Sequence, residues 1–483
     1  MNPVWALVPP LAVIPFILIF GENRRNWREG SIIVAGLVLL WINNQLYNDV
    51  MQGTVRSSGE IHLLSQFSLR LQAEPMGVVF GLVASLLWIV TTVYSIGYMR
   101  GHDEKHQTRF YVCFAICLSA VMAAAYSANL LTLFVAYEVI TLSTFPLVIH
   151  AGHDKALAAG RLYLGLLMAS SIGLFLPAII WTANSAGTLD FVTGGILANS
   201  GIGKAGLSVL LALFVFGIAK AATMPFHRWL PAAMVAPTPV SALLHAVAVV
   251  KTGVFSLLKI VTYIFGIDVI STSGANDLLL FVAGFTVVVA SVVAFTKDNL
   301  KARLAYSTIG QLAYIVLAAL LATEMAVSGG VLHIVMHAFG KITLFFCAGA
   351  ILVAAHRSNI SELDGIGRVM PLTMAAFFIG SLSIIGLPPA GGVWSKLLIA
   401  GGSFDTQTWI WAGVLMLSTV LNIAYLIPIS LRAFFQPFKG DPAEYSEAPF
   451  PSLWAIMLTS LCCVLLFFFP APITDLINLI QWR

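Results

Sequence analysis

Four lysines stand inside long apolar stretches of this sequence, where an ammonium group is costly. They are Lys220, Lys251, Lys341 and Lys396. A charged group at the centre of a bilayer costs roughly 2.5–3.5 kcal/mol, so several of them in one chain need a hydrated or paired setting. An amine with access to water and to a carboxylate can gain and lose a proton. These lysines therefore indicate proton transfer inside a membrane.

Other ionisable residues occupy similar apolar stretches. Glu138 lies in "LFVAYEVITL" and is predicted to stand beside Lys220, while His245 lies in "ALLHAVAVVK". In "VLHIVMHAFGKITLFF", His333, His337 and Lys341 are spaced four residues apart, which places them on one face of a helix. The spacing predicts a stripe of titratable groups.

Structural explanations compete with this interpretation. A lysine near a helix end usually extends its amine to the membrane interface, which we expect of Lys259 and which is an alternative for Lys341 and Lys396. His245 is explained as well by a satisfied polar contact as by a relay. His333 and His337 have no carboxylate or cysteine that obviously joins them, so no metal site is predicted. We expect structural roles for the loop histidines His102, His106, His150, His153 and His356.

Two apolar segments are interrupted by glycine and proline. "LFVFGIAKAATMPFHRWLP" carries Lys220 and is predicted to break at Pro225, and "IIGLPPAGGVWSK" is predicted to break at Pro388 and Pro389 before Lys396. Backbone groups freed inside a membrane are tolerated where they line a hydrated cavity. A broken helix beside a buried lysine thus predicts a protonatable site that water can reach.

The composition requires a membrane setting for these segments. Of 483 residues, 59% are hydrophobic and 10% are charged, and the mean hydropathy is +0.93. We predict an all-α polytopic protein with about fourteen spans, because apolar runs near twenty residues recur. The spans are 3–20, 31–48, 76–99, 109–126, 128–149, 156–183, 205–236, 238–263, 277–296, 301–322, 327–355, 370–400, 408–435 and 451–470.

Several classes of protein are disfavoured. The five cysteines lie in apolar context without paired CxxC motifs, and the chain lacks a GxxxxGK[ST] phosphate loop and a strand-borne GxGxxG. No cofactor, metal, nucleotide hydrolysis or nucleic-acid partner is therefore expected. The apolar N-terminus is interpreted as a first spanning helix rather than a signal peptide, because its positive charges follow the apolar run.

The basic residues predict the topology, since cytoplasmic loops carry most Lys and Arg. They concentrate after odd-numbered spans. The other side of the predicted membrane has only Arg56, Arg70, Lys204, Lys259 and Arg483. Both termini are therefore expected outside the cytoplasm.

The two broken segments occupy similar places in two five-helix blocks. An odd number of helices per block makes the second copy run inverted, and paired broken helices in inverted repeats indicate a transport site near the midplane. The predicted units are helices 1–3 at residues 1–108, a first repeat at 109–265, a second repeat at 276–436 and a last helix within 437–483.

Several motifs in order then resemble one family. They are "AYE" with Glu138, "AKAATMPFHRWLP" with Lys220, "APTPVSALLHAVAVVKTG" with Lys251, "NLKARLAYSTIGQLAYI", "HIVMHAFGKITLFF" and "GLPPAGGVWSK" with Lys396. Together they resemble the antiporter-like subunits shared by respiratory complex I, membrane-bound hydrogenases and Mrp-type cation/proton antiporters. The similarity covers about residues 75–435.

The resemblance implies a polar axis across the membrane. It makes Lys220 the central proton carrier and Glu138 the carboxylate that modulates it. It also implies that Lys251 with His245 connects to the cytoplasm, that His333 and His337 continue the axis with Lys341, and that Lys396 lies near the exit. One departure is Ala232, which follows "WLP" where many relatives have aspartate, so that carboxylate has no entry role here.

The lysine at position 396 and the compact length favour a compact member of the family, such as the Mrp antiporter component MrpD. The expected function is proton translocation in a multi-subunit Na⁺(K⁺)/H⁺ antiporter of a bacterial inner membrane, with other membrane subunits, lipid, protons and Na⁺ or K⁺ as partners. The alternatives are the membrane subunit of a complex I-like oxidoreductase or a hydrogenase, and, less favoured, a subunit for inorganic-carbon uptake.

Overall fold

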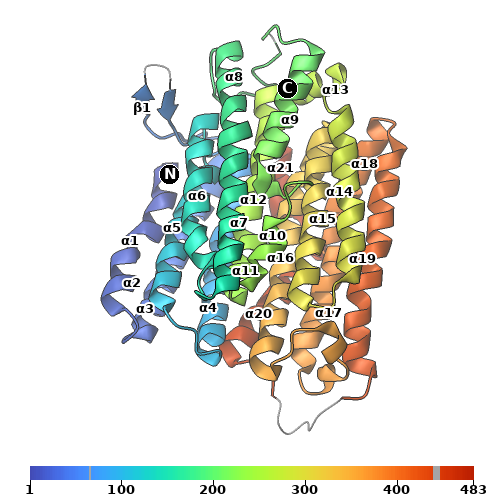
Figure 1. The fold of residues 1–483 in the computed structure, drawn as a ribbon. Helices are drawn as coiled ribbons and strands as arrows, with labels where there is room; N and C mark the ends of the chain where they lie inside the picture. The colour runs from blue at the N-terminus through green and yellow to red at the C-terminus, as the bar shows by residue number, and fades with distance from the viewer. Residues whose placement is uncertain (65–66, 199, 439–445, 483) are drawn as a thin grey trace.

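The computed structural model describes residues 1–64, 67–198, 200–438 and 446–482. It is a bundle of long helices whose axes run roughly parallel (Figure 1), so the predicted all-α class is confirmed. Both termini lie toward the same end of the bundle, which we call the terminal face. The side chain of His245, Lys439 and Arg483 lie outside the described residues.

The first half of the chain forms helices because its apolar runs satisfy every backbone group internally, as a membrane requires. Its elements are η1 (Pro3–Leu7), α1 (Val8–Ala12), α2 (Ile14–Phe20), α3 (Arg25–Met51), α4 (Pro75–Gly101), α5 (Gln107–Ala125), α6 (Leu130–Val148), α7 (Asp154–Ser170), η2 (Ser171–Phe175), α8 (Leu176–Ala186), α9 (Lys204–Gly217), η3 (Ala219–Ala221), α10 (Trp229–Ala232) and η4 (Ala233–Val235).

The second half repeats this helical character. Its elements are α11 (Thr238–Ala242), η5 (Leu243–Val247), α12 (Val249–Ile260), η6 (Val261–Phe265), α13 (Ile267–Ser273), α14 (Asp277–Thr296), α15 (Leu300–Leu321), α16 (Glu324–Ala355), η7 (Ile360–Glu362), η8 (Ile366–Arg368), α17 (Pro371–Ile385), α18 (Gly392–Asp405), α19 (Trp409–Phe435), α20 (Phe450–Phe468) and α21 (Ala471–Asn478).

Most predicted spans are continuous helices. Among the described residues, eleven helices are long and apolar enough to cross a membrane, and the segment 249–273 adds a helix pair bent by 81°. Helices α9 and α17 are shorter apolar helices that end at the predicted interruptions. The count of fourteen treats each interrupted segment as one span and remains a prediction.

One small sheet was not predicted. Within the connection between α3 and α4, strands β1 (Ile61–Leu64) and β2 (Phe67–Leu69) form an antiparallel hairpin. The hairpin lies at the terminal face (Figure 1). Strands this short carry too little alternation to be told from a loop in the sequence.

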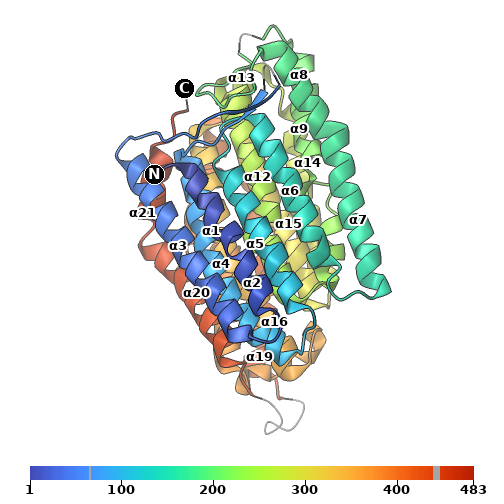
Figure 2. The same cartoon turned by 90° about the vertical axis from the view of Figure 1, so that its left-hand side faces the viewer.

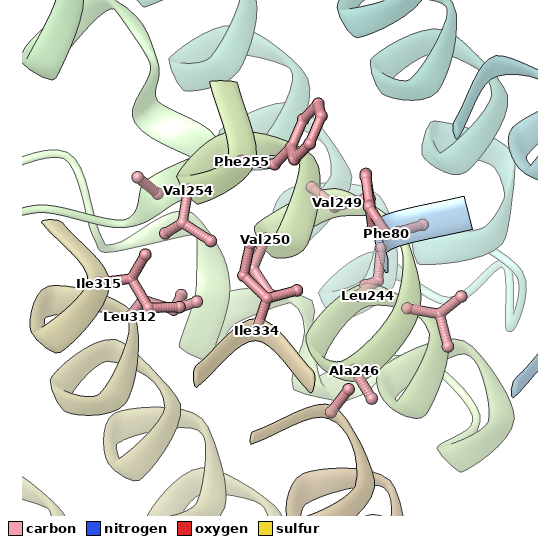
Figure 3. Packing of buried hydrophobic residues seen from close by; sticks show 14 of the residues in the cluster. Phe80, Leu244, Ala246, Val249, Val250, Val254, Phe255, Leu312, Ile315 and Ile334 are labelled. Atoms are coloured by element: carbon pink, nitrogen blue, oxygen red, sulfur yellow. The ribbon is translucent and has the colours of Figure 1, made fainter. Parts of the chain in front are cut away.

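The centre of the bundle is formed by α12, α15 and α16. Figure 3 shows Val250 and Val254 of α12 beside Ile315 and Ile334, which come from α15 and α16. On another side of α12, the ring centroids of Phe255 and Phe80 are 4.9 Å apart. This packing is apolar, so ionisable side chains in the same region depend on contacts with one another and with nearby hydroxyl and carbonyl groups.

The bundle edges differ in composition. Figure 2 shows α1, α3, α20 and α21 along one edge and α7 and α8 along the other. Outward apolar side chains such as Leu278 of α14 and Phe435 of α19 are 75% and 78% exposed. Apolar exposure of this kind suits contact with lipid or with another membrane subunit.

A buried ion-pair network joins α3, α4 and α5 at the end opposite the terminal face. The Arg28 guanidinium is fully buried and donates to Glu22 at 3.0 Å, to Glu29 at 3.1 Å and to Gln107 at 2.9 Å. Arg100 also pairs with Glu29. Arg28 therefore has a packing role beyond the topology signal that the sequence indicated.

Candidate functional site

Lys220 lies in the interruption itself. The sequence predicts a helix that passes through Lys220 and breaks at Pro225, but α9 ends at Gly217, before the lysine. Lys220 occupies the 3₁₀ turn η3 and is fully buried. The helix ends early because the turn lets the Lys220 side chain reach α6, where its ammonium donates to the Tyr137 carbonyl at 2.7 Å and to the Thr141 hydroxyl at 2.5 Å.

The turn at Lys220 is held by close backbone packing. A Cβ atom on Gly253 of α12 would lie 2.5 Å from the Ala221 nitrogen, so only glycine permits this approach. The indole Nε1 of Trp229 donates to the Ala219 carbonyl at 2.9 Å, which satisfies an acceptor that the broken helix leaves free. The ammonium of Lys220 also lies 3.1 Å from the centroid of the Tyr137 ring.

Glu138 is near Lys220 but does not pair with it directly. Within the described part of the chain, no ion pair joins the two side chains, and both Glu138 carboxylate oxygens are buried without a hydrogen-bond partner. Lys220 contacts the residues on either side of it in α6, Tyr137 and Thr141. A carboxylate buried without a partner is unstable, so Glu138 needs a proton, water or a neighbouring group.

Lys251 and two histidines form a continuous set of contacts. The Lys251 amine is hydrogen-bonded to Nδ1 of His337. The rings of His337 and His333 are stacked, with centroids 5.8 Å apart and an interplanar angle of 21°. All three side chains are buried. The predicted one-face spacing of the two histidines is thus observed as a contact.

His333 extends these contacts toward the second interruption. Its Nε2 lies 3.1 Å from the Gln311 amide oxygen, and its Nδ1 lies 2.8 Å from the hydroxyl of Ser395, the residue before Lys396. The Lys396 ammonium donates to the Ile385 carbonyl at 2.8 Å and lies 4.8 Å from the centroid of the Tyr314 ring.

The second interruption is a short turn. Pro388 and Pro389 lie in it as predicted, between the end of α17 at Ile385 and the start of α18 at Gly392. Lys396 follows in the first turns of α18 and is 9% exposed. The alternative in which Lys396 extends to the headgroups is therefore excluded.

Lys341 belongs to a separate branch. It shares α16 with His333 and His337, yet its ammonium donates to the Ser307 hydroxyl at 2.6 Å and the Leu304 carbonyl at 3.3 Å. Ser307 also accepts from the hydroxyl of Tyr425 at 2.8 Å. Lys341 is fully buried, so it does not extend to the interface either.

The prediction for Lys259 was wrong. Instead of reaching the headgroups, Lys259 is fully buried and pairs with Glu74 at 2.7 Å between Nζ and Oε1. Its amine also donates to the Ser127 carbonyl at 2.5 Å and lies 4.1 Å from the Phe191 ring centroid. Glu74 lines a cavity of about 270 Å³, bordered also by residues 50, 53–55 and 479. The sequence did not show this pair, because its members are far apart in the chain.

The neutral partners of the lysines were also missed. Tyr137, Thr141, Ser307, Gln311 and Ser395 carry no charge, so nothing distinguishes them from other buried polar residues in a sequence. Only the "AYE" motif, in which Tyr137 precedes Glu138, was a local signal.

These features define a class of protein: a polytopic helical membrane protein with ionisable side chains in its interior. The sequence profile of the family described as NADH:quinone oxidoreductase/Mrp antiporter, transmembrane, matches residues 127–422. The matched region exceeds half of the chain, and it holds Lys220, Lys251, Lys341 and Lys396. The chain therefore belongs to this family.

Curated relatives include chains of quinone oxidoreductases. NAD(P)H-quinone oxidoreductase chain 5 of Synechocystis sp. is 30% identical over 442 residues, covering 86% of this chain and 62% of the relative. NADH-quinone oxidoreductase subunit L of Mycobacterium tuberculosis is 27% identical over 477 residues, covering 94% of this chain and 73% of the relative. The chain thus spans less than two thirds of the first of these relatives.

Two solved structures share the fold. A chain of the Mrp complex from Dietzia sp. superposes with a TM-score of 0.87 at 19% identity, covering 99% of this chain and 96% of that chain. A chain of the membrane-bound sulfane sulfur reductase, an archaeal respiratory membrane complex, superposes with a TM-score of 0.85 at 23% identity and covers the same shares of the two chains.

Proposed function

We propose that this chain is a proton-translocating, antiporter-like subunit of a multi-subunit Mrp-type Na⁺(K⁺)/H⁺ antiporter. The observation that carries the proposal is the set of contacts from Lys251 through His337 and His333 to Ser395, beside Lys396. Amines and imidazoles in contact, buried in an apolar bundle, suit proton exchange better than structural support, since unpaired charges weaken a core.

Each histidine in this set can both accept and donate a proton. With Nε2 of His333 donating to Gln311, its Nδ1 is free to accept from Ser395. Nδ1 of His337 faces the Lys251 amine and can accept one of its protons. A proton that leaves Lys251 thus passes to an imidazole, and the stacked rings bring it next to the site of Lys396.

Lys220 is the reservoir at the other interruption. When protonated, its ammonium is held by the Tyr137 carbonyl and the Thr141 hydroxyl. Loss of that proton leaves a neutral amine, which weakens both contacts and removes the nearby positive charge from Glu138. Because Glu138 has no partner of its own in the described structure, its charge responds to the state of Lys220.

The same proposal assigns the surroundings. Basic residues are in excess at the end of the bundle opposite the terminal face, so we assign that opposite end to the cytoplasm of a bacterial cell, across its inner membrane. Relatives and structural neighbours are parts of larger complexes, which supports membrane subunits as partners. The two halves of the chain, each with one interruption, are then inverted repeats that meet at the lysine sites.

The test is cation-driven proton uptake by everted vesicles that contain the complex. We expect Lys251→Ala to abolish uptake, because it removes the amine at the start of the contact series. The matched control is Lys204→Ala, which removes an exposed lysine at the terminal face. Uptake at the wild-type rate in Lys251→Ala would refute the proposal.

A second candidate function has specific support. The curated relatives named above are oxidoreductase chains, so the same proton route is also consistent with coupling to electron transfer in a partner. Purification of the intact complex separates the two. Flavin and iron–sulfur proteins among its subunits favour the redox-driven complex, and small hydrophobic subunits alone favour the antiporter.

A further inference from the structure

Loop histidines that are scattered along the sequence surround one cavity at the face opposite the termini. The cavity has a volume of about 520 Å³ and is lined by the end of α4, the loop after it, the loop between α6 and α7, and the segment from η4 to α11. We call it the histidine vestibule. Its ionisable lining residues are Tyr98, His102, Asp103, Glu104, Lys105, His106, His150, His153 and Lys301.

The vestibule reaches the backbone that begins the route to Lys251. Ala236 and Pro237 line it, and the Lys301 ammonium donates to the Ala236 carbonyl at 2.7 Å. Helix α11 starts at the next residue and continues through the π-helical turn η5 into α12, which carries Lys251. The opening therefore lies at the start of the segment that enters the bundle.

An unsatisfied hydroxyl marks this route on the inner side. Ser241 of α11 is fully buried, and its Oγ has no hydrogen-bond partner among the described residues. A buried hydroxyl that lacks a protein partner normally binds an ordered water. Water at Ser241 would lie between the vestibule and Lys251 along the chain.

Three of the histidines are exposed and the fourth is not. His102, His106 and His153 are on the surface of the vestibule, whereas His150 is buried and Arg109 donates to its backbone carbonyl at 3.0 Å. Burial, together with the Arg109 charge, lowers the pKa of His150 to about 4, so His150 stays neutral near pH 7. The three exposed imidazoles are the groups that can exchange protons with the medium.

Proton supply from bulk water is slow at alkaline pH. A single site that collects free protons at the diffusion limit of about 10¹⁰ M⁻¹s⁻¹ is loaded only about 100 times per second at pH 8. We propose that the histidine vestibule is a proton-exchange site that loads and unloads the route to Lys251. This inference rests on the proposed function and adds to it the surface that meets the medium.

The test compares proton uptake in weak and in strong mobile buffer. The variant combines His102→Asn, His106→Asn and His153→Asn in the intact complex. Asparagine suits these positions, because His153 caps α7 through its side chain and His106 has a φ of 56°, which asparagine tolerates. The control is His356→Asn, another exposed histidine with a positive φ, which does not line the vestibule.

At alkaline pH in weak buffer, we expect the triple variant to take up protons more slowly by about 10-fold, the lower end of what a focusing cleft adds to association rates. Strong buffer should restore it to the wild-type rate, since buffer molecules then deliver protons directly. The wild type and His356→Asn should depend little on buffer. A triple variant that matches the wild type in weak buffer, or that stays slow in strong buffer, would overturn the proposal.

Two further measurements keep the result clear. Should the triple variant fail to assemble, the wild type alone tests the idea, because wild-type uptake that rises about 10-fold with added buffer would contradict an efficient exchange site. Lys251→Ala should be inactive in both buffers. If it transports, the proposed function fails, while the comparison of buffers still judges the vestibule.

Discussion

The two lysines at the helix interruptions have similar partners but different surroundings. Each ammonium donates to a backbone carbonyl, Tyr137 for Lys220 and Ile385 for Lys396, and each faces a tyrosine ring. Lys220 has in addition the Thr141 hydroxyl and a fully buried side chain, whereas Lys396 is 9% exposed.

The sequence around the two tyrosines explains part of the difference. Tyr137 is followed by Glu138, and Tyr314 is followed by Ile315, which is buried in the apolar core. A carboxylate therefore stands near the first lysine, and an aliphatic side chain takes the corresponding position near the second. One fold thus provides a carboxylate-modulated lysine and a lysine nearer to solvent.

The largest effect is expected at the first interruption. Lys220→Ala should reduce proton uptake by about 100-fold or more, as does the loss of a group that takes and gives a proton. Lys396→Ala should reduce it less, because a water can enter where the side chain is already partly exposed. Initial rates in vesicles with equal amounts of complex check this, and equal losses in the two variants would break the comparison.

A third lysine sharpens the comparison because it has a fixed partner. Glu74→Gln leaves Lys259 buried without its carboxylate, and breaking such a pair costs about 3–5 kcal/mol of stability. Lys204→Met, which removes an exposed partner of Asp277 at 3.8 Å, should cost about 0–1 kcal/mol. Thermal unfolding of the purified complex measures both, and similar small losses would show that the buried pair is not structural.

A smaller effect is expected when one contact of Lys220 is removed. Thr141→Val deletes a hydroxyl that binds the ammonium, and a hydrogen bond to a charged group contributes about 1.5–3 kcal/mol, so uptake should fall by about 10-fold. Thr144→Val is the control, because Thr144 bonds to Ile140 and Tyr163 instead. No change in Thr141→Val would make the two lysine sites equivalent.

The smallest effect concerns pH and the fold rather than transport. The pKa of His150 falls from 6.5 to about 4 in the folded chain, mainly through burial, so the unfolded chain binds the proton more readily. Stability from this group is complete above pH 6.5 and is lost as the pH falls toward 4. The midpoint of thermal unfolding should decline over that range less steeply in His150→Gln than in the wild type. Identical slopes would contradict this assignment.

Much of the architecture could be predicted from the sequence. Apolar length determined the membrane helices, and the glycine and proline at both interruptions located the breaks, since these residues cannot continue a helix. The start of the first break was missed. Gly217 through Lys220 look like continuous apolar helix in the sequence, and only the contact of Lys220 with α6 explains why the helix ends there.

The site was predictable to the extent that charge marks it. Lysine and histidine stand out in an apolar chain, so Lys251, His333 and His337 were found, and their contacts follow from helical spacing and packing. Pairings between distant segments were not. Lys259 looked like an interface residue because its carboxylate, Glu74, begins a helix much earlier in the chain.

The tight approach at Gly253 has a mechanical meaning. No hydrogen bond within the described structure joins the side chains of Lys220 and Lys251, yet α12 rests on the peptide unit that follows Lys220 with no side chain between them. A displacement of α12 toward η3 must push that peptide unit. Motion, rather than a shared proton, is then the means by which the two halves of the molecule sense each other.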